Sequence, residues 1–363
     1  MRGEVDPQSS MFHYFSVESR IPADHPLRRV KKLAESALSA ISAELDGLYA
    51  RTGRPSIPPE RLLKAQLLIA LYSVRSDRLF CEQLDYNLLF RWFLDLDLES
   101  GGLDQSNFSR LRERLVETDI ARRFFDEAVR LARKDKLLSS DHFTVDGTLI
   151  DAWASFKSFK RKDDKEPPKP GDGTGMVDFK GEKRSNATHQ SSTDPEAKLM
   201  RKGNGQPARL SYGGHALMEN RSGLCVDLLI TDATLAEHQA ARQLLTRARR
   251  RKIHPKTLGA DKGYHVKDFV QHLREHKIKP HIARIDGRKT PGLDGRTSCT
   301  EGYKVSQRKR KRIEEIFGWL KTVGGMRKTR FIGQARTQIA AYLSAAAYNL
   351  LRIAKLQSAG SAA

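Results

Sequence analysis

Cysteine is scarce in this chain of 363 residues: Cys81, Cys225 and Cys299 are the only three, and no two form a Cys-x-x-Cys pair. We therefore expect neither a disulfide framework nor a cysteine-rich zinc site. The scarcity of cysteine also indicates a reducing compartment. Long apolar runs are also missing. The longest, residues 67–71 and 339–347, fall far short of the about 20 residues that a membrane span needs, and the amino terminus lacks the apolar segment of a secretion signal. A cytoplasmic location is expected.

Acidic residues are too few to balance the basic ones. The 65 Lys and Arg residues outnumber the 44 Asp and Glu residues, which gives a net charge of +21 and a pI near 10.0. A polyanionic partner is the leading expectation, although a solubilising surface is compatible with the same total. The length corresponds to about two domains of roughly 150 residues. With 39% apolar residues, such domains can form packed cores.

Residues 1–138 are predicted to form an all-helical N-terminal domain, because apolar residues from Pro26 to Leu138 recur at spacings of three and four. Asp104 is a suitable N-cap for a helix over NFSRLRERL, which carries Arg110 and Arg112. These arginines contact DNA if the helix is the recognition helix of a helix-turn-helix motif. A plain helical bundle with exposed arginines explains the pattern nearly as well, so both interpretations stay open.

Residues 155–210 differ from the rest of the chain in composition. The segment is rich in Lys, Asp, Pro, Gly and Ser, and it is too polar to bury a core of its own. We predict a polar, basic insert loop that is mostly mobile. Thr193 or Asp194, directly before Pro195, is a plausible helix start, and a partner could order this second half of the insert.

The segments around the insert predict an α/β domain made of residues 139–154 and 211–335, followed by a C-terminal helix and tail over 336–363. Strands are expected at 142–152, 215–219, 224–231, 257–260 and 280–283, and helices at 236–250, 266–276 and 309–321. The order is βββαβαβα. Three antiparallel strands followed by alternating helices and parallel strands make a mixed five-stranded sheet, which is the arrangement of the ribonuclease H fold.

Three carboxylates occupy the places where this fold brings side chains together. Asp146 lies in the first strand, Asp261 directly follows the fourth, and Glu314 lies in the last helix. Hard cations such as Mg²⁺ prefer a few carboxylate oxygens and leave other positions to water and phosphate. Two ions about 3.5 to 4 Å apart can activate a nucleophile and stabilise the leaving oxygen of a phosphoryl displacement. The pattern therefore indicates metal-dependent chemistry on an anionic substrate such as DNA.

Neighbouring acidic residues are poorer candidates for the same site. Side chains alternate along a strand, so Asp151 points to the face opposite Asp146. On a helical wheel Glu314 lies at the edge of the apolar stripe, whereas Glu315 faces solvent. A purely structural interpretation remains, in which the two aspartates end strands and Glu314 pairs with Arg310.

With these motifs the chain resembles a DDE transposase of bacterial insertion sequences, in the insertion-sequence-five-like group of the insertion-sequence-four superfamily. The group's carboxy-terminal signature, Tyr-x2-Arg-x3-Glu-x6-Lys, is matched by Arg310, Glu314 and Lys321. Gln307 stands at the tyrosine position, which is a departure from the signature. The runs TVDGT and GADKGY, around the two aspartates, are similar to the family's first and second aspartate motifs.

The resemblance implies cleavage of DNA at terminal inverted repeats and the joining of freed 3′-hydroxyl ends to target DNA. Asp146, Asp261 and Glu314 would be both catalytic residues and ligands of two Mg²⁺ ions, with Mn²⁺ able to substitute. A homodimer on paired DNA ends, associated with the nucleoid, is also implied. Beyond Arg110 and Arg112, the DNA-binding candidates are Arg308, Lys309, Arg310, Arg312, Trp319 and Lys321.

The roles of these candidates follow from charge and shape. Arg310 and Lys321 would clamp terminal phosphates, and the basic run before Glu314 would line a DNA groove. Trp319 could stack on an unpaired base or simply pack against a neighbouring element. Two other functions stay open, a ribonuclease H-like nuclease without strand transfer and a catalytically inactive DNA-binding regulator.

Overall fold

The computed structural model describes residues 15–47, 49, 52, 56–116, 118–163, 184–203 and 205–360. Within these ranges, helices alone precede the first strand. Their bounds are α1 Val17–Arg20, α2 Pro26–Ala40, α3 Ser42–Asp46, α4 Pro59–Leu71, α5 Asp77–Tyr86, α6 Leu88–Phe93, α7 Gln105–Arg114 and α8 Ile120–Lys134. Polar side chains cap several of them, and Asp104 accepts a hydrogen bond of 2.8 Å from the backbone N–H of Asn107, as predicted for α7.

The second part of the chain contains a mixed sheet, which confirms the predicted α/β class. Its strands are β1 His142–Asp151, β4 Lys198–Met200, β5 Arg209–Glu219, β6 Leu224–Asp232, β7 Thr257–Ala260 and β8 Lys279–Ile282. β5 pairs with β1, β4 and β6, always antiparallel. β1 pairs parallel with β7, and β7 pairs parallel with β8. β1 is therefore the central strand, flanked by the antiparallel and the parallel parts of the sheet.

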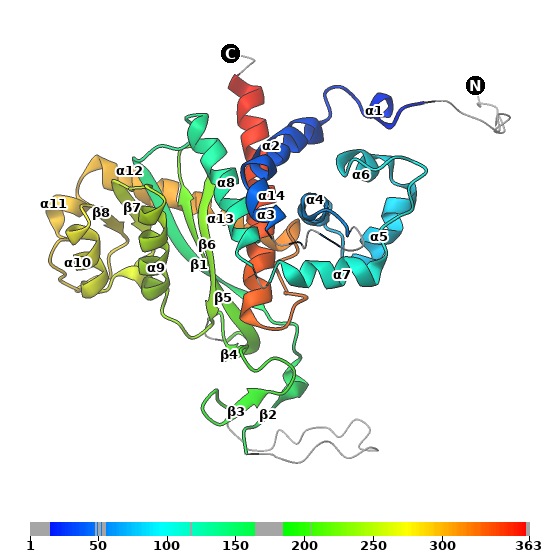
Figure 1. Ribbon diagram of the computed structural model, residues 1–363. Coiled ribbons are helices and arrows are strands. Elements are labelled where there is room, and N and C mark those ends of the chain that lie inside the picture. Colours follow the sequence, from blue (N-terminus) through cyan, green and yellow to red (C-terminus); the bar gives the residue numbers. More distant parts are fainter. Residues whose placement is uncertain are drawn as a thin grey trace, which may run out of the picture.

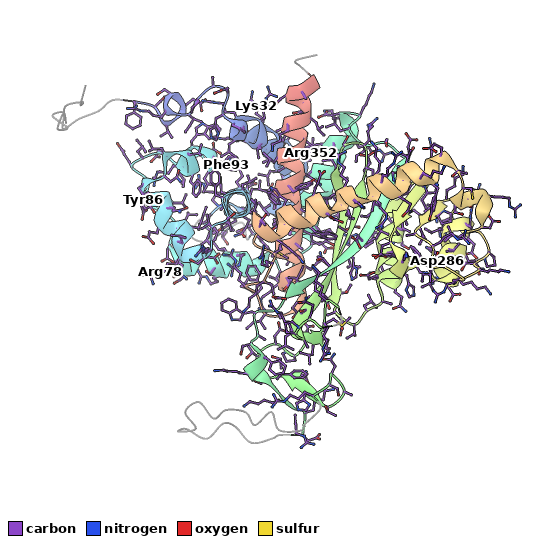
Figure 2. The ribbon with its side chains drawn as sticks, turned by 180° about the vertical axis from the view of Figure 1, so that it is seen from behind. Lys32, Arg78, Tyr86, Phe93, Asp286 and Arg352 are labelled. Atoms are coloured by element: carbon purple, nitrogen blue, oxygen red, sulfur yellow. The ribbon has the colours of Figure 1, made fainter. Side chains whose placement is uncertain are left out.

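Helices cover both faces of the sheet. α9 (Glu237–Arg250) packs on β5 and β6, and α10 (Lys267–Glu275) packs beside β8. α11 (Gly295–Ser298), α12 (Glu301–Lys309) and α13 (Ile313–Thr322) follow β8. The view from behind in Figure 2 shows α12 and α13 crossing the face of the sheet opposite to α9. β5 is almost entirely buried because it is covered on both faces.

The long helix α14 (Gln334–Gly360) connects the two parts of the molecule. It contacts α2, α4 and α8 on one side and β6 on the other, and Figure 1 shows it running between the helical part and the sheet. The Asn349 side chain pairs with both backbone groups of Cys225, at 2.9 Å and 2.7 Å. The predicted C-terminal helix is thus present, and it begins slightly earlier than expected. No helix in the described ranges is both long and apolar enough to span a membrane.

The described parts of the predicted insert loop are more ordered than expected. A 3₁₀ turn over Phe156–Ser158 leads into β2 (Phe159–Arg161), which pairs with β3 (His189–Ser191), and β4 extends the main sheet. The rest of the insert, residues 164–183 and 204, lies outside the described residues. The expectation of a mostly mobile loop is therefore wrong for the described part, because backbone pairing of β2 with β3 and of β4 with β5 compensates for its polar composition.

The helix start predicted at Thr193 or Asp194 is also wrong. A turn follows β3, and the Asp194 carboxylate is fully buried there. It accepts hydrogen bonds of 2.7 Å and 2.8 Å from the Tyr212 hydroxyl. Asp194 therefore forms a buried tertiary contact with β5 and does not cap a helix.

Candidate active site

Asp146 lies in the middle of β1 and is mostly buried. The backbone N–H of Gly147 donates a hydrogen bond of 2.8 Å to its Oδ1. Burial raises the pKa of Asp146 to about 6, and the negative charges of Asp261 and Glu314 act in the same direction. The N–H of Gly147 and the charge of Arg310 oppose this rise. Asp146 therefore lies within the electrostatic field of both other predicted carboxylates.

Asp261 and Glu314 reach this region from two other elements. Asp261 directly follows β7, and its Oδ1 accepts a hydrogen bond of 2.8 Å from the backbone N–H of Gly263. Glu314 lies in the first turn of α13 and is exposed. The neighbouring Glu315 is engaged elsewhere, 3.5 Å from Arg312. The fold thus places Asp261 and Glu314 near enough to Asp146 for their charges to act on it.

A fourth carboxylate, that of Glu237, lies near Asp146 and Asp261 and was not among the residues predicted from the sequence. It is the first residue of α9, and burial raises its pKa to about 7, with the charges of Asp261 and Asp146 adding to the effect. The sequence did carry a signal, because a helix start was predicted at this point, just after the third strand. Polar residues after a strand of an α/β sheet are candidates for a site.

Two basic residues of the signature lie beside the carboxylates. Lys321 donates a hydrogen bond of 2.6 Å from Nζ to the hydroxyl of Thr148, which shares the strand face of Asp146. Burial lowers the pKa of Lys321. The Nε of Arg310 donates to Oε1 of Gln307 at 3.0 Å, and the Gln307 amide in turn donates to the backbone carbonyl of His281 in β8. Gln307, at the signature's tyrosine position, therefore anchors Arg310 to the sheet.

The basic run before α13 lines a groove of 770 Å³ that includes Glu314. Its lining residues are Val305, Arg308, Lys309, Lys311, Arg312, Glu314 and Glu315. Arg308 and Lys309 are exposed, whereas Arg312 donates hydrogen bonds to the backbone carbonyls of Asn220 and Arg221 at 2.9 Å and 3.0 Å. Trp319 packs edge-on against Tyr348 of α14, with ring centroids 5.5 Å apart. For Trp319, the structure thus contains the packed arrangement that was the alternative to base stacking.

The arginines of α7 are placed differently from one another. Arg110 is exposed and donates to the Asn107 side chain at 2.7 Å. Arg112 forms an ion pair with the buried Asp77 of α5, and Arg330 lies 3.3 Å from the same carboxylate. The guanidinium of Arg112 therefore holds helices together and is less available for an external partner than that of Arg110.

The donor set fits a divalent cation. Within the described ranges, no Lys or Arg forms an ion pair with Asp146, Glu237, Asp261 or Glu314. The buried hydroxyl of Tyr264, which feels the charges of Glu237, Asp146 and Asp261, has no hydrogen-bond partner. Carboxylates without a basic partner are the ligands that Mg²⁺ and Mn²⁺ prefer. The residues present therefore match the chemistry of such an ion.

Transposases are among the solved structures to which the chain is similar. Among solved structures, the chain is similar to the piggyBac transposase synaptic complex with hairpin DNA at 12% identity, covering 92% of this chain and 76% of that one with a TM-score of 0.41. It is similar to the Mos1 transposase paired-end complex with left transposon end at 11% identity, covering 76% and 81%, with a TM-score of 0.21. No curated protein matches.

Two family models match separate parts of the chain. Residues 15–114 match a transposase domain, DUF772, and residues 172–350 match the transposase DDE domain. The second match contains Asp261 and Glu314 and begins after Asp146. The two models together cover most of the sequence, and they identify a transposase domain followed by a transposase DDE domain.

Proposed function

We propose that this protein is the transposase of a bacterial insertion sequence of the insertion-sequence-five-like group. It binds the terminal inverted repeats of the element, cleaves DNA there and joins 3′-hydroxyl ends to target DNA. The observation that carries this proposal is that the charges of Asp261 and Glu314, from two other elements, both act on the half-buried Asp146. The order β6–β5–β1–β7–β8 supports a ribonuclease H-like catalytic domain, preceded by a helical N-terminal domain.

In this proposal Asp146, Asp261 and Glu314 hold two Mg²⁺ ions, for which Mn²⁺ can substitute. When bound, such ions generate a nucleophile at neutral pH and neutralise charge on the reacting phosphate. The chain itself orients the DNA: Lys321, fixed by Thr148, and Arg310, fixed by Gln307, present positive charge beside the carboxylates. Charge-assisted contacts to phosphate oxygens from these two groups would align the scissile bond.

DNA is the proposed partner on both parts of the chain. The exposed Arg308 and Lys309 give the groove beside Glu314 the charge that a phosphate backbone needs. Arg110 on α7 is the candidate contact of the helical part, while Arg312 and Trp319 support the walls of the site. We propose a homodimer on two DNA ends, and a protein associated with the bacterial nucleoid.

The test replaces Asp146 by Asn in the full chain. Asp146→Asn should lower Mg²⁺-dependent cleavage of inverted-repeat DNA about 10²- to 10³-fold or more, because a preorganised electrostatic contact to the reacting groups is lost. Binding to the same DNA should change little. Cleavage is measured on end-labelled duplexes, and strand transfer is measured as joined product from pre-cleaved ends and a target plasmid.

Asp141→Asn is a matched control, since Asp141 is an exposed residue just before β1 that pairs with Lys256 at 2.8 Å. It should leave cleavage unchanged. Undiminished cleavage by Asp146→Asn would overturn the proposed site. Hydrolysis without any joined product in the native protein would instead identify a nuclease that lacks strand transfer.

A further inference from the structure

We infer that Glu237 is a fourth carboxylate ligand of the divalent cation site, held in place by the small volumes of Gly147 and Gly263. This inference rests on the proposed function, which it deepens by adding a ligand outside the three signature residues. Glu237 comes from the first turn of α9, on the sheet face opposite α13. It therefore approaches the two aspartates from the face opposite the helix that carries Glu314.

Two glycines make room for the Glu237 side chain. A Cβ placed on Gly147 would lie 2.8 Å from Oε1 of Glu237, closer than real Cβ contacts allow. A Cβ on Gly263 would lie 3.2 Å from Oε2 of Glu237 and 3.1 Å from Oδ1 of Asp261. Gly147 directly follows Asp146, and Gly263 lies two residues after Asp261. The backbone at both aspartates is thus shaped to admit a third carboxylate between them.

A buried hydroxyl near these carboxylates, that of Tyr264, has no hydrogen-bond partner. Tyr264 is fully buried, its hydroxyl has no hydrogen-bond partner, and the charge of Glu237 is the strongest that acts on it. An unpaired buried hydroxyl costs free energy unless a ligand or water completes its hydrogen bonding. This hydroxyl is therefore a second, independent sign that something binds among the carboxylates.

The imidazole of His215 cannot neutralise Glu237. The Thr231 hydroxyl donates its hydrogen to the backbone carbonyl of Asp232 at 2.9 Å, so it accepts from Nε2–H of His215 at 3.0 Å. Nδ1 of His215 then carries a lone pair, and it is buried without a partner, 3.1 Å from the position of a Cβ on Gly147. Both Glu237 and His215 thus present electron pairs to this region, which suits a cation.

The N-terminus of α9 supplies only part of the missing positive charge. A carboxylate in the first turn of a helix gains about 0.3 to 1 kcal/mol from the helix dipole, much less than a buried charge loses in desolvation. Ala236, the N-cap residue, offers no side-chain hydrogen bond. Stabilisation of the helix alone therefore does not explain why Glu237 lies close to the charges of Asp146 and Asp261.

The experiment measures Mn²⁺ binding to the full-length protein by electron paramagnetic resonance, without DNA. Only the Mn²⁺ that excess Mg²⁺ displaces is counted, because His272, Glu275 and His276 on α10 form a separate group able to hold a metal. Glu237→Gln should weaken this binding at least about tenfold or remove one ion, as Asp146→Asn does. Glu127→Gln, which removes a carboxylate paired with Arg130 on α8, should bind as the native protein does.

The outcomes separate the two levels of the proposal. Native Mn²⁺ binding by Glu237→Gln, with binding lost in Asp146→Asn, would overturn the role of Glu237 alone. Equal binding by the native protein and Asp146→Asn would overturn the metal site of the proposed function. Glu237→Asp, which keeps the charge on a shorter side chain, should bind better than Glu237→Gln.

Thermal unfolding distinguishes a ligand from a structural residue. In EDTA, Glu237→Gln should have a Tm at or above that of the native protein, since it relieves repulsion with Asp146 and Asp261. The rise in Tm that Mn²⁺ causes should shrink in this variant. A lower Tm in EDTA together with a full Mn²⁺ response would show that Glu237 only stabilises the fold.

Discussion

Two regions of the sheet bury carboxylates and treat their charge in opposite ways. Asp227 on β6 is 2% exposed, and Arg251 and Arg247 of α9 lie 2.8 Å and 3.1 Å from its oxygens. Asp146 on β1 is also mostly buried, yet no basic side chain in the described ranges pairs with it. The fold provides arginines at Asp227, whereas at Asp146 the proposed function assigns the compensating charge to divalent cations from solution.

The Asp227 cluster joins elements from both parts of the molecule. Arg251, at the end of α9, also pairs with Asp126 of α8 at 2.5 Å. Burial raises the pKa of Asp227, while the two guanidinium groups act to lower it. The cluster therefore links the helical part to the sheet through charges that compensate one another, whereas the carboxylates around Asp146 repel one another.

The largest expected effect is on stability, from the removal of Asp227. Asp227→Ala leaves Arg247 without a carboxylate and Arg251 with Asp126 alone, and it should lower the free energy of unfolding by about 3 to 5 kcal/mol. Urea unfolding followed by circular dichroism measures the change. Asp141→Asn, which breaks an exposed ion pair, should cost less than about 1 kcal/mol. Similar losses in the two variants would remove the distinction between the two regions.

A smaller effect with the opposite sign is expected at Asp146, in the absence of divalent cations. Its pKa is raised to about 6 from an ordinary value of 3.8, so between these values the folded protein binds more protons than the unfolded one. The charged form at pH 8 therefore costs stability. Asp146→Asn should be more stable than the native protein there, by about 1 to 2 kcal/mol.

This advantage of Asp146→Asn should stay constant above pH 6 and shrink as the pH falls from about 6 toward 3.8, the range in which the folded protein keeps the proton and the unfolded chain loses it. Taking the difference between the two proteins cancels the titration of the buried histidines that they share. Urea unfolding in EDTA at several pH values measures it. A difference that does not change with pH would mean that Asp146 is not under electrostatic strain.

The smallest effect is expected at Gln307, which holds Arg310, a positive charge that acts on Asp146. Gln307→Ala removes the acceptor that holds Nε of Arg310 and should slow cleavage about three- to tenfold, which corresponds to one hydrogen bond of about 1 kcal/mol. Gln307→Glu retains an acceptor for Arg310 and should recover most of the rate. Cleavage kinetics at saturating DNA measure both variants, and equal rates for the two would exclude a positioning role.

Local patterns predicted much of the catalytic part. The strand at 257–260 has the bounds that were expected, and Asp261 follows it directly, because an apolar run ends there in a polar turn. The choice of Glu314 over Glu315 follows from helical periodicity, and the structure places Glu315 against Arg312. These features depend on residues close in sequence, which is why one sequence was enough to find them.

Features that depend on distant residues could not be predicted. The partner of Arg112 is Asp77, which lies 35 residues away in another helix. The strand expected from His215 begins six residues earlier, at Arg209, because β4 pairs with its polar start. The polar composition of residues 155–210 predicted a loop. Polar segments can nevertheless form strands when a neighbouring strand pairs with their backbone, as it does for β2, β3 and β4. The sequence indicates Glu237 only as a polar residue at a helix start after a strand, and its position beside Gly147 and Gly263 depends on the folded chain.

The position of α14 has a consequence for how the protein is made. This helix follows both the helical part and the sheet in the chain, yet both of them pack against it. Until residues 334–360 have emerged, α2, α4 and α8 and the strand β6 all lack an apolar neighbour. Folding of the two parts is therefore coupled to the synthesis of α14, and a chain that lacks this helix exposes apolar surfaces to chaperones and proteases.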